Sequence, residues 1–134
     1  MKRRLTILGS TGSVGLQALD VVRAHLDRFE LVGLAAGRSA GALREQALEF
    51  SPEFVALENG EADDLDGLPC ETLIGPGSAE RLAEAPADVV LNGIVGFAGL
   101  AATVGALRAG NRVALANKES LIAGGEWVMS LAEE

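Results

Sequence analysis

The residues best suited to chemistry near the start of the chain lie in the segment Gly9–Gly15, whose three glycines are spaced as GxxGxxG. The segment separates a short β-prone run that ends at Leu8 from a stretch with apolar residues at helical spacing. In a strand-turn-helix unit, such glycines allow a tight bend and a close approach of the backbone to a pyrophosphate, while free N–H groups at the helix start face the anion. The pattern indicates a dinucleotide-binding turn, and the alternative is a purely structural turn.

A second candidate site follows the next strand, where the sequence reads Gly37-Arg38-Ser39. Domains specific for NAD usually carry an acidic residue at this place, which bonds the ribose hydroxyls. An arginine with a hydroxyl residue suits the 2'-phosphate of NADP instead, because a guanidinium pairs well with phosphate. The alternative is that Arg38 is a solvated surface residue.

Two further segments follow later strands of the predicted sheet. The glycine-rich stretch 92–99 comes after one strand, and Asn117-Lys118-Glu119-Ser120 follows the last one. Open α/β sheets bind ligands at the carboxyl ends of their strands, so both segments are candidates for cofactor or substrate contact. The first could equally be a loop whose glycines serve packing, and the second could supply ordinary helix-start residues.

The elements that position these residues alternate along the chain. Apolar runs without a helical stripe predict strands, and stretches with apolar residues at helical spacing or bounded by turn residues predict helices. Strands are expected over 5–8, 29–36, 54–57, 71–74, 88–92 and 112–116, and helices over 13–26, 40–50, 78–85, 99–109 and from about 118–120 to the end. The helix over 13–26 places Leu16, Leu19, Val22 and Leu26 in one stripe, and the acidic stretch 58–69 is expected to be a surface excursion without a site. The alternation predicts a single α/β domain over 1–134, with a doubly wound, mostly parallel, Rossmann-like sheet.

Composition and charge narrow the functional classes. Hydrophobic residues make up 49% of the chain and charged residues 22%, which is typical of a globular protein. The formal charge is -8 and the basic residues are scattered, so nucleic acid is not an expected partner. The apolar run after the basic N-terminus is too short for a signal peptide or a membrane span, so we expect a cytoplasmic protein without a membrane partner. Cys70 is the only cysteine and is interpreted as structural or incidental, and no residues show metal-ligand spacing.

Three segments together resemble the 1-deoxy-D-xylulose 5-phosphate reductoisomerase family: Gly9–Gly15, the stretch 92–110 and, most specifically, 115–121 with its sequence LANKESL. The resemblance covers essentially the whole chain. Members of that family continue well past this length, so the resemblance implies an N-terminal NADPH-binding domain without the catalytic and C-terminal domains. It also implies that the isolated chain binds NADPH without turnover.

The resemblance implies an NADPH-dependent oxidoreductase that isomerises and reduces 1-deoxy-D-xylulose 5-phosphate to 2-C-methyl-D-erythritol 4-phosphate in isoprenoid precursor synthesis. A divalent metal (Mg or Mn) and a homodimer are implied for the full enzyme only. Carried over by motif, the contacts to the cofactor phosphates fall on Thr11, Gly12, Ser13 and Val14, next to Gly9 of the fingerprint. Gly37, Arg38 and Ser39 would contact the adenosine phosphate end, Asn117 and Glu119 the nicotinamide side, and Lys118 the sugar substrate.

The family often has Lys and Asn where this chain has Arg38 and Ser39. Charge and hydrogen-bonding capacity are retained, so the NADP preference is expected to be retained as well. None of the assigned residues is itself an acid or base of the reaction. A non-catalytic nucleotide-sensing domain of the same fold is therefore an alternative. Another NADP-dependent reductase is a second alternative, against which the Asn117–Ser120 motif argues.

Overall fold

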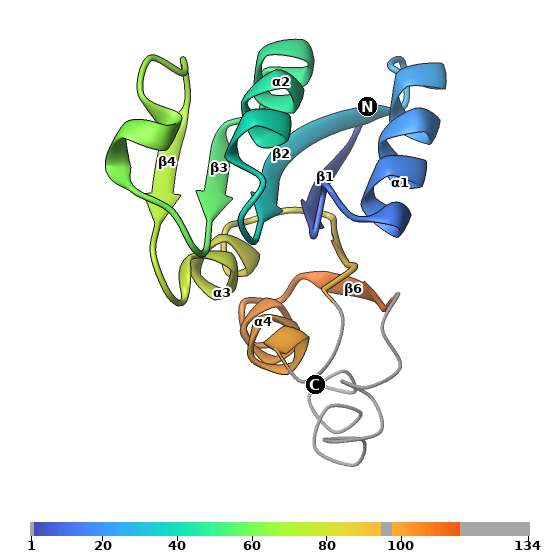
Figure 1. The fold of residues 1–134 in the computed structure, drawn as a ribbon. Coiled ribbons are helices and arrows are strands. Elements are labelled where there is room, and N and C mark those ends of the chain that lie inside the picture. The colour runs from blue at the N-terminus through green and yellow to red at the C-terminus, as the bar shows by residue number, and fades with distance from the viewer. Residues whose placement is uncertain (1, 95–97, 116–134) are drawn as a thin grey trace.

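A computed structural model describes residues 2–94 and 98–115 as a layered α/β unit built on one sheet (Figure 1). The six strands are all parallel and lie in the order β4-β3-β2-β1-β5-β6. Their bounds are β1 Arg3–Leu8, β2 Phe29–Ala36, β3 Phe54–Leu57, β4 Glu71–Ile74, β5 Val89–Asn92 and β6 Arg112–Leu115. The four α-helices are α1 Ser13–Ala24, α2 Ala40–Phe50, α3 Ser78–Ala83 and α4 Ala98–Arg108.

The helices cover both faces of the sheet, which confirms the predicted doubly wound architecture. Helices α1 and α2 lie on one side, and α3 and α4 pack together on the other (Figure 1). The chain winds outward from β1 to β4 and then returns to the other side of β1 to add β5 and β6. The strand order therefore reverses at β1, where its carboxyl end and that of β5 lie side by side.

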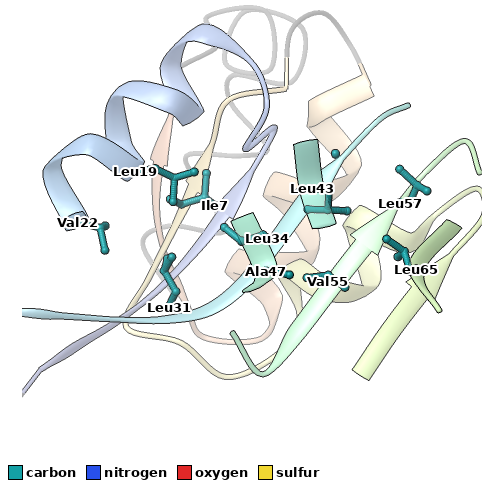
Figure 2. Packing of buried hydrophobic residues seen from close by; sticks show 11 residues of the cluster. Ile7, Leu19, Val22, Leu31, Leu34, Leu43, Ala47, Val55, Leu57 and Leu65 are labelled. Carbon is teal, nitrogen blue, oxygen red and sulfur yellow. The ribbon is translucent and has the colours of Figure 1, made fainter. Parts of the chain in front are cut away.

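The core beneath α1 and α2 is built mainly from branched aliphatic side chains, as Figure 2 shows. Leu19 and Val22 of α1 are buried, but Leu16 is 49% and Leu26 is 55% exposed. The helix predicted over 13–26 thus ends two residues earlier, and of its four predicted apolar positions only Leu19 and Val22 are buried. Leu26 lies beyond the end of α1, and the first turn of α1 faces the sheet through the buried Gly15 instead of Leu16.

The opposite face is packed with smaller residues. Ala79, Ala83, Ala102 and Ala106 of α3 and α4 are buried against the sheet. Leu82 reaches so close to β2 that a Cβ on Gly33 would lie 2.6 Å from its Cδ1 atom. Small side chains thus allow α3 and α4 to lie close to the strands.

The connection from β3 to β4 differs from the predicted surface excursion. It contains a 3-10 helix, η1 Ala62–Leu65, whose Leu65 is only 2% exposed and belongs to the core. The Arg44 guanidinium of α2 donates to the Asp66 carbonyl oxygen at 2.7 Å, which fastens this connection to α2. Elsewhere the predicted elements are confirmed to within a few residues, while the predicted C-terminal helix lies outside the described residues. Across residues 2–94 and 98–115, no helix has the length and apolar character needed to cross a membrane.

Two buried threonines lead to opposite stability predictions for the same substitution. The Thr6 hydroxyl in β1 is fully buried and lacks a hydrogen-bond partner within the described residues, so Thr6→Val should raise the free energy of unfolding by about 1 kcal/mol. The Thr103 hydroxyl accepts a hydrogen bond from Asn92 Nδ2 at 2.7 Å, so Thr103→Val should lower it by about 1 kcal/mol. Urea denaturation followed by circular dichroism measures both, and a loss of stability in Thr6→Val would contradict the assignment.

Candidate functional site

A cleft of ≈ 580 Å³ opens at the carboxyl edge of the sheet, within the size range of small-molecule sites. It lies at the point where the strand order reverses and extends toward β3 and α3. Its lining consists mainly of glycine and alanine, with two carboxylates. The lining residues are Gly9, Gly12, Ser13, Val14, Ala35, Ala36, Gly37, Glu58, Asn59, Gly77, Ala79, Glu80, Gly93, Ile94, Ala101 and Ala102.

The turn between β1 and α1 is held by its own backbone. Gly9 has φ +79°, a left-handed conformation that glycine adopts at little cost. The N–H groups of Gly9 and Ser10 both donate to the Ala35 carbonyl oxygen, at 2.8 and 2.9 Å, and the Gly12 N–H donates to the Gly9 carbonyl oxygen at 3.1 Å. The first half of the turn is therefore fixed to β2 before the helix begins.

Two glycines allow close backbone contacts around this turn. A Cβ on Gly15 would lie 2.2 Å from the Gly9 carbonyl oxygen, so only glycine lets α1 start against the turn. A Cβ on Gly9 would lie 3.1 Å from the backbone of Gly93, which follows β5. The roles predicted for the fingerprint glycines, a tight turn and close helix packing, agree with these contacts.

The start of α1 offers backbone donors to the cleft. Gly12 is the N-cap residue, and among the described residues no side chain caps this helix end. The first hydrogen bond of the helix runs from the Leu16 N–H to the Gly12 carbonyl oxygen at 2.9 Å, so the N–H groups of the preceding residues have no partner within the helix. Because Gly12, Ser13 and Val14 line the cleft, this end of α1 is arranged to receive an anion.

A buried polar pair, which the sequence analysis missed, ties this turn to α2. The Ser10 hydroxyl donates to Gln46 Oε1 at 2.7 Å, and Gln46 Nε2 donates back to the Ser10 carbonyl oxygen at 3.0 Å. Ser10 is 0% and Gln46 8% exposed. The available signal was Gln46 itself, a polar residue on the buried face of α2 between Leu43 and Ala47.

Asn92 supports the opposite wall of the cleft at the end of β5. Its Nδ2 donates to the Gly99 carbonyl oxygen at 2.8 Å, and its Oδ1 accepts from the Ile94 N–H at 3.1 Å. The side chain is fully buried and spans the two ends of the loop that joins β5 to α4. Of the glycine-rich segment predicted here, Gly93 and Ile94 line the cleft, and residues 95–97 lie outside the described residues.

The acidic side of the cleft was also missed, because the stretch that begins at Glu58 was expected to carry no site. Glu58 follows β3 directly, and its carboxylate accepts hydrogen bonds from the Gly77 N–H at 2.6 Å and the Ala79 N–H at 3.3 Å. Asn59, Gly77 and Glu80 line the same part of the cleft. The strand order explains why Glu58 was not predicted. β3 lies next to β2, so Glu58 at the end of β3 comes to the same carboxyl edge of the sheet as Gly37, for which a site was predicted from β2 alone.

The structure brings many of the predicted cofactor residues together. Gly9, Gly12, Ser13, Val14 and Gly37 line the cleft. Thr11 belongs to the same turn but is not a lining residue, and Arg38 and Ser39 are exposed beside Gly37 at the cleft margin. Within the part of the chain that the structure describes, the Arg38 side chain forms no hydrogen bond or ion pair with the protein. The predicted contacts Asn117, Lys118 and Glu119 lie outside the described residues.

Neither Cys70 nor a group of metal-ligating side chains adds a reactive centre to the described part of the cleft. Cys70 is half-buried and packs against the core, and burial raises the pKa of its thiol, which disfavours the nucleophilic thiolate. Between residues 2–94 and 98–115, no three His, Cys, Asp or Glu side chains are grouped as metal ligands. The described part of the cleft is thus suited to binding a ligand through backbone donors and shape.

Comparisons with known proteins identify relatives of this chain. The model of the family described as 1-deoxy-D-xylulose 5-phosphate reductoisomerase matches residues 5–125. The reductoisomerase of Leifsonia xyli subsp. xyli is 52% identical over 131 residues, which cover 97% of this chain and 32% of that protein. That of Beutenbergia cavernae is 53% identical over 130 residues, covering 91% and 33%. The chain spans about a third of the length of the curated relatives it matches.

Solved structures agree with the sequence relatives. The reductoisomerase of Zymomonas mobilis in complex with NADPH superposes with a TM-score of 0.92 at 33% identity, over 99% of this chain and 36% of that one. A reductoisomerase complex with NADPH, fosmidomycin and magnesium gives a TM-score of 0.91 at 34% identity, over 98% and 34%. Fold and cleft together define a Rossmann-like α/β domain. Because the family model matches residues 5–125, the chain belongs to the 1-deoxy-D-xylulose 5-phosphate reductoisomerase family.

The close contact at Gly15 makes a prediction with a helical control. Helix propensity alone would make Gly15→Ala stabilising by about 1 kcal/mol. We expect Gly15→Ala to lower the free energy of unfolding by about 3 kcal/mol or more instead, because the new Cβ would overlap the Gly9 carbonyl oxygen and the Ser10 backbone. Gly41→Ala in α2, where a Cβ meets nothing within 4 Å, should show the propensity gain. Thermal and urea unfolding of both variants test this, and equal gains would mean that Gly15 is not a packing glycine.

Proposed function

We propose that this chain is the NADPH-binding domain of a 1-deoxy-D-xylulose 5-phosphate reductoisomerase. The observation that carries the proposal is the glycine turn at the start of α1, which borders the cleft at the point where the strand order reverses. Dinucleotide-binding domains place the pyrophosphate at this position. Family membership and the NADPH complex of the Zymomonas mobilis relative support the same cofactor.

The described residues fit a dinucleotide. Gly9 has φ +79°, and a Cβ there would lie 3.1 Å from the Gly93 backbone, so glycine at this position keeps the turn free of a side chain. Thr11, Ser13 and Val14 would bind the pyrophosphate through backbone N–H groups and hydroxyls, and Gly12, whose own N–H donates to the Gly9 carbonyl oxygen, would contact it without a side chain. The exposed Arg38 and Ser39, beside Gly37, would bind the 2'-phosphate that distinguishes NADPH from NADH.

The remaining assignments follow from family membership. Asn117 and Glu119 would contact the nicotinamide side and Lys118 the sugar phosphate substrate. When bound, NADPH supplies the hydride that reduces the aldehyde formed by rearrangement of 1-deoxy-D-xylulose 5-phosphate, which gives 2-C-methyl-D-erythritol 4-phosphate for isoprenoid precursor synthesis. The residues of this chain would hold and orient the cofactor for that reaction.

The whole protein would need more than this domain. A divalent metal, Mg or Mn, would assist the reaction, and magnesium is present in complexes of relatives. The described part of this chain has no three-ligand group for a metal. From family membership, we propose that the metal ligands and the homodimer belong to the full enzyme. We propose a cytoplasmic protein without nucleic-acid or membrane partners, and we expect this chain alone to bind NADPH without turnover.

The proposal is tested by titrating the chain with NADPH and NADH in a calorimeter. NADPH should bind more tightly, and Arg38→Ala should lower NADPH affinity about tenfold or more while leaving NADH affinity unchanged, because only NADPH carries the 2'-phosphate. Arg28→Ala is the matched control, because Arg28 is also exposed but precedes β2 at the opposite edge of the sheet. A folded chain that binds neither cofactor would overturn the proposal.

A second test concerns Lys118 in the full enzyme. Lys118→Ala should raise KM for 1-deoxy-D-xylulose 5-phosphate about tenfold or more, since it removes a cation next to an anionic substrate, and should leave NADPH affinity unchanged. Steady-state kinetics and a separate NADPH titration measure the two effects. An unchanged KM would favour another NADP-dependent reductase.

A further inference from the structure

Glu58 is a charged residue of the cleft that takes no part in the proposed phosphate contacts. It follows β3, and the pairing of β2 with β3 continues past the strand ends. The Glu58 N–H donates to the Ala36 carbonyl oxygen at 3.0 Å, and the Asn59 N–H to the Gly37 carbonyl oxygen at 2.8 Å. Glu58 is therefore fixed beside Gly37, one residue before the proposed 2'-phosphate contact.

The Glu58 side chain is fixed as well as its backbone. One carboxylate oxygen accepts from the Gly77 N–H at 2.6 Å and the other from the Ala79 N–H at 3.3 Å. Each oxygen can accept a further hydrogen bond, and the residue lines the cleft. A carboxylate held in this way offers acceptors only, so it selects a ligand group with N–H or O–H donors and repels a phosphate.

The part of the dinucleotide that reaches Glu58 follows from the two phosphate positions. The proposed pyrophosphate contact is the start of α1, and the proposed 2'-phosphate contact is Arg38. Both phosphates are attached to the ribose that carries the adenine, so the adenine lies near Gly37. Ala36 and Ala79, with α4 opposite, provide small apolar surfaces for a flat ring there.

We infer that Glu58 recognises the exocyclic amino group of adenine and so determines the base specificity of the cofactor site. This inference rests on the proposed NADPH function and extends it to the base. The amino group is the hydrogen-bond donor at the edge of the adenine ring. A hypoxanthine base carries an oxygen acceptor at the same place and would face the carboxylate with like polarity.

The test compares NADPH with its deamino form, which carries hypoxanthine, by calorimetric titration of the chain. The wild-type chain should prefer NADPH about tenfold or more, since a site that binds a donor rejects an analogue lacking it. In Glu58→Gln, one oxygen remains for the Gly77 N–H and an amide NH2 group replaces the other. That group can donate to hypoxanthine, so the preference should disappear or reverse.

Glu80→Gln is the matched control, because Glu80 also lines the cleft and the same charge is removed, but its side chain is exposed on α3. It should retain the wild-type preference. Equal binding of the two cofactors by the wild-type chain would overturn the inference while leaving the proposed function intact, even if Glu58→Gln fails to fold. Loss of preference in Glu80→Gln to the same extent would also overturn it, and binding of neither cofactor would instead overturn the proposed function.

Discussion

The backbones of two loops that are distant in the sequence meet at the carboxyl edge of the sheet, where Gly9 lies against Gly93. This contact exists because β1 and β5 are parallel neighbours in register, with Leu8 opposite Asn92. A Cβ on Gly9 would lie 3.1 Å from the Gly93 backbone, and a Cβ on Gly93 would lie 3.2 Å from the Leu8 carbonyl oxygen, so a side chain at either position would crowd this contact. The position of α1, and of the N–H groups at its start, depends on the same turn, because Gly15 packs against the Gly9 carbonyl oxygen.

The net charge of the chain does not determine whether an anion can bind at a particular part of the cleft. The chain carries a formal charge of -8, and the charged residues that line the described cleft are the carboxylates Glu58 and Glu80. A phosphate can bind here only where backbone donors or a cation outweigh that charge. The start of α1 and the exposed Arg38 meet this condition at one end, and Glu58 sets the opposite polarity beside them. Under the proposed function, the cleft would thus be divided between an anion-binding part and a part that binds hydrogen-bond donors.

Much of the fold could be predicted from the sequence because local signals agreed with it. Parallel strands buried on both faces gave apolar runs at Phe29–Ala36 and Phe54–Leu57, and turn residues marked their ends. The lining residues Gly9, Gly12, Ser13 and Val14 were predicted from the glycine spacing, and Gly37, Gly93 and Ile94 from their places after a strand. Glu58 and the Ser10–Gln46 pair were not predicted, because their contacts depend on the strand order and on helix packing, which residue spacing does not encode.

The Ser10 to Gln46 pair connects the two proposed phosphate contacts. Gln46 lies in α2, and α2 begins directly after Ser39, at the segment proposed for the 2'-phosphate. Ser10 lies in the turn proposed for the pyrophosphate, and both of its polar contacts to Gln46 are buried. A buried, reciprocally bonded pair is costly to separate, so a displacement of α2 would also displace the turn. The distance between the two segments proposed to bind phosphate is therefore set by the fold of the chain itself.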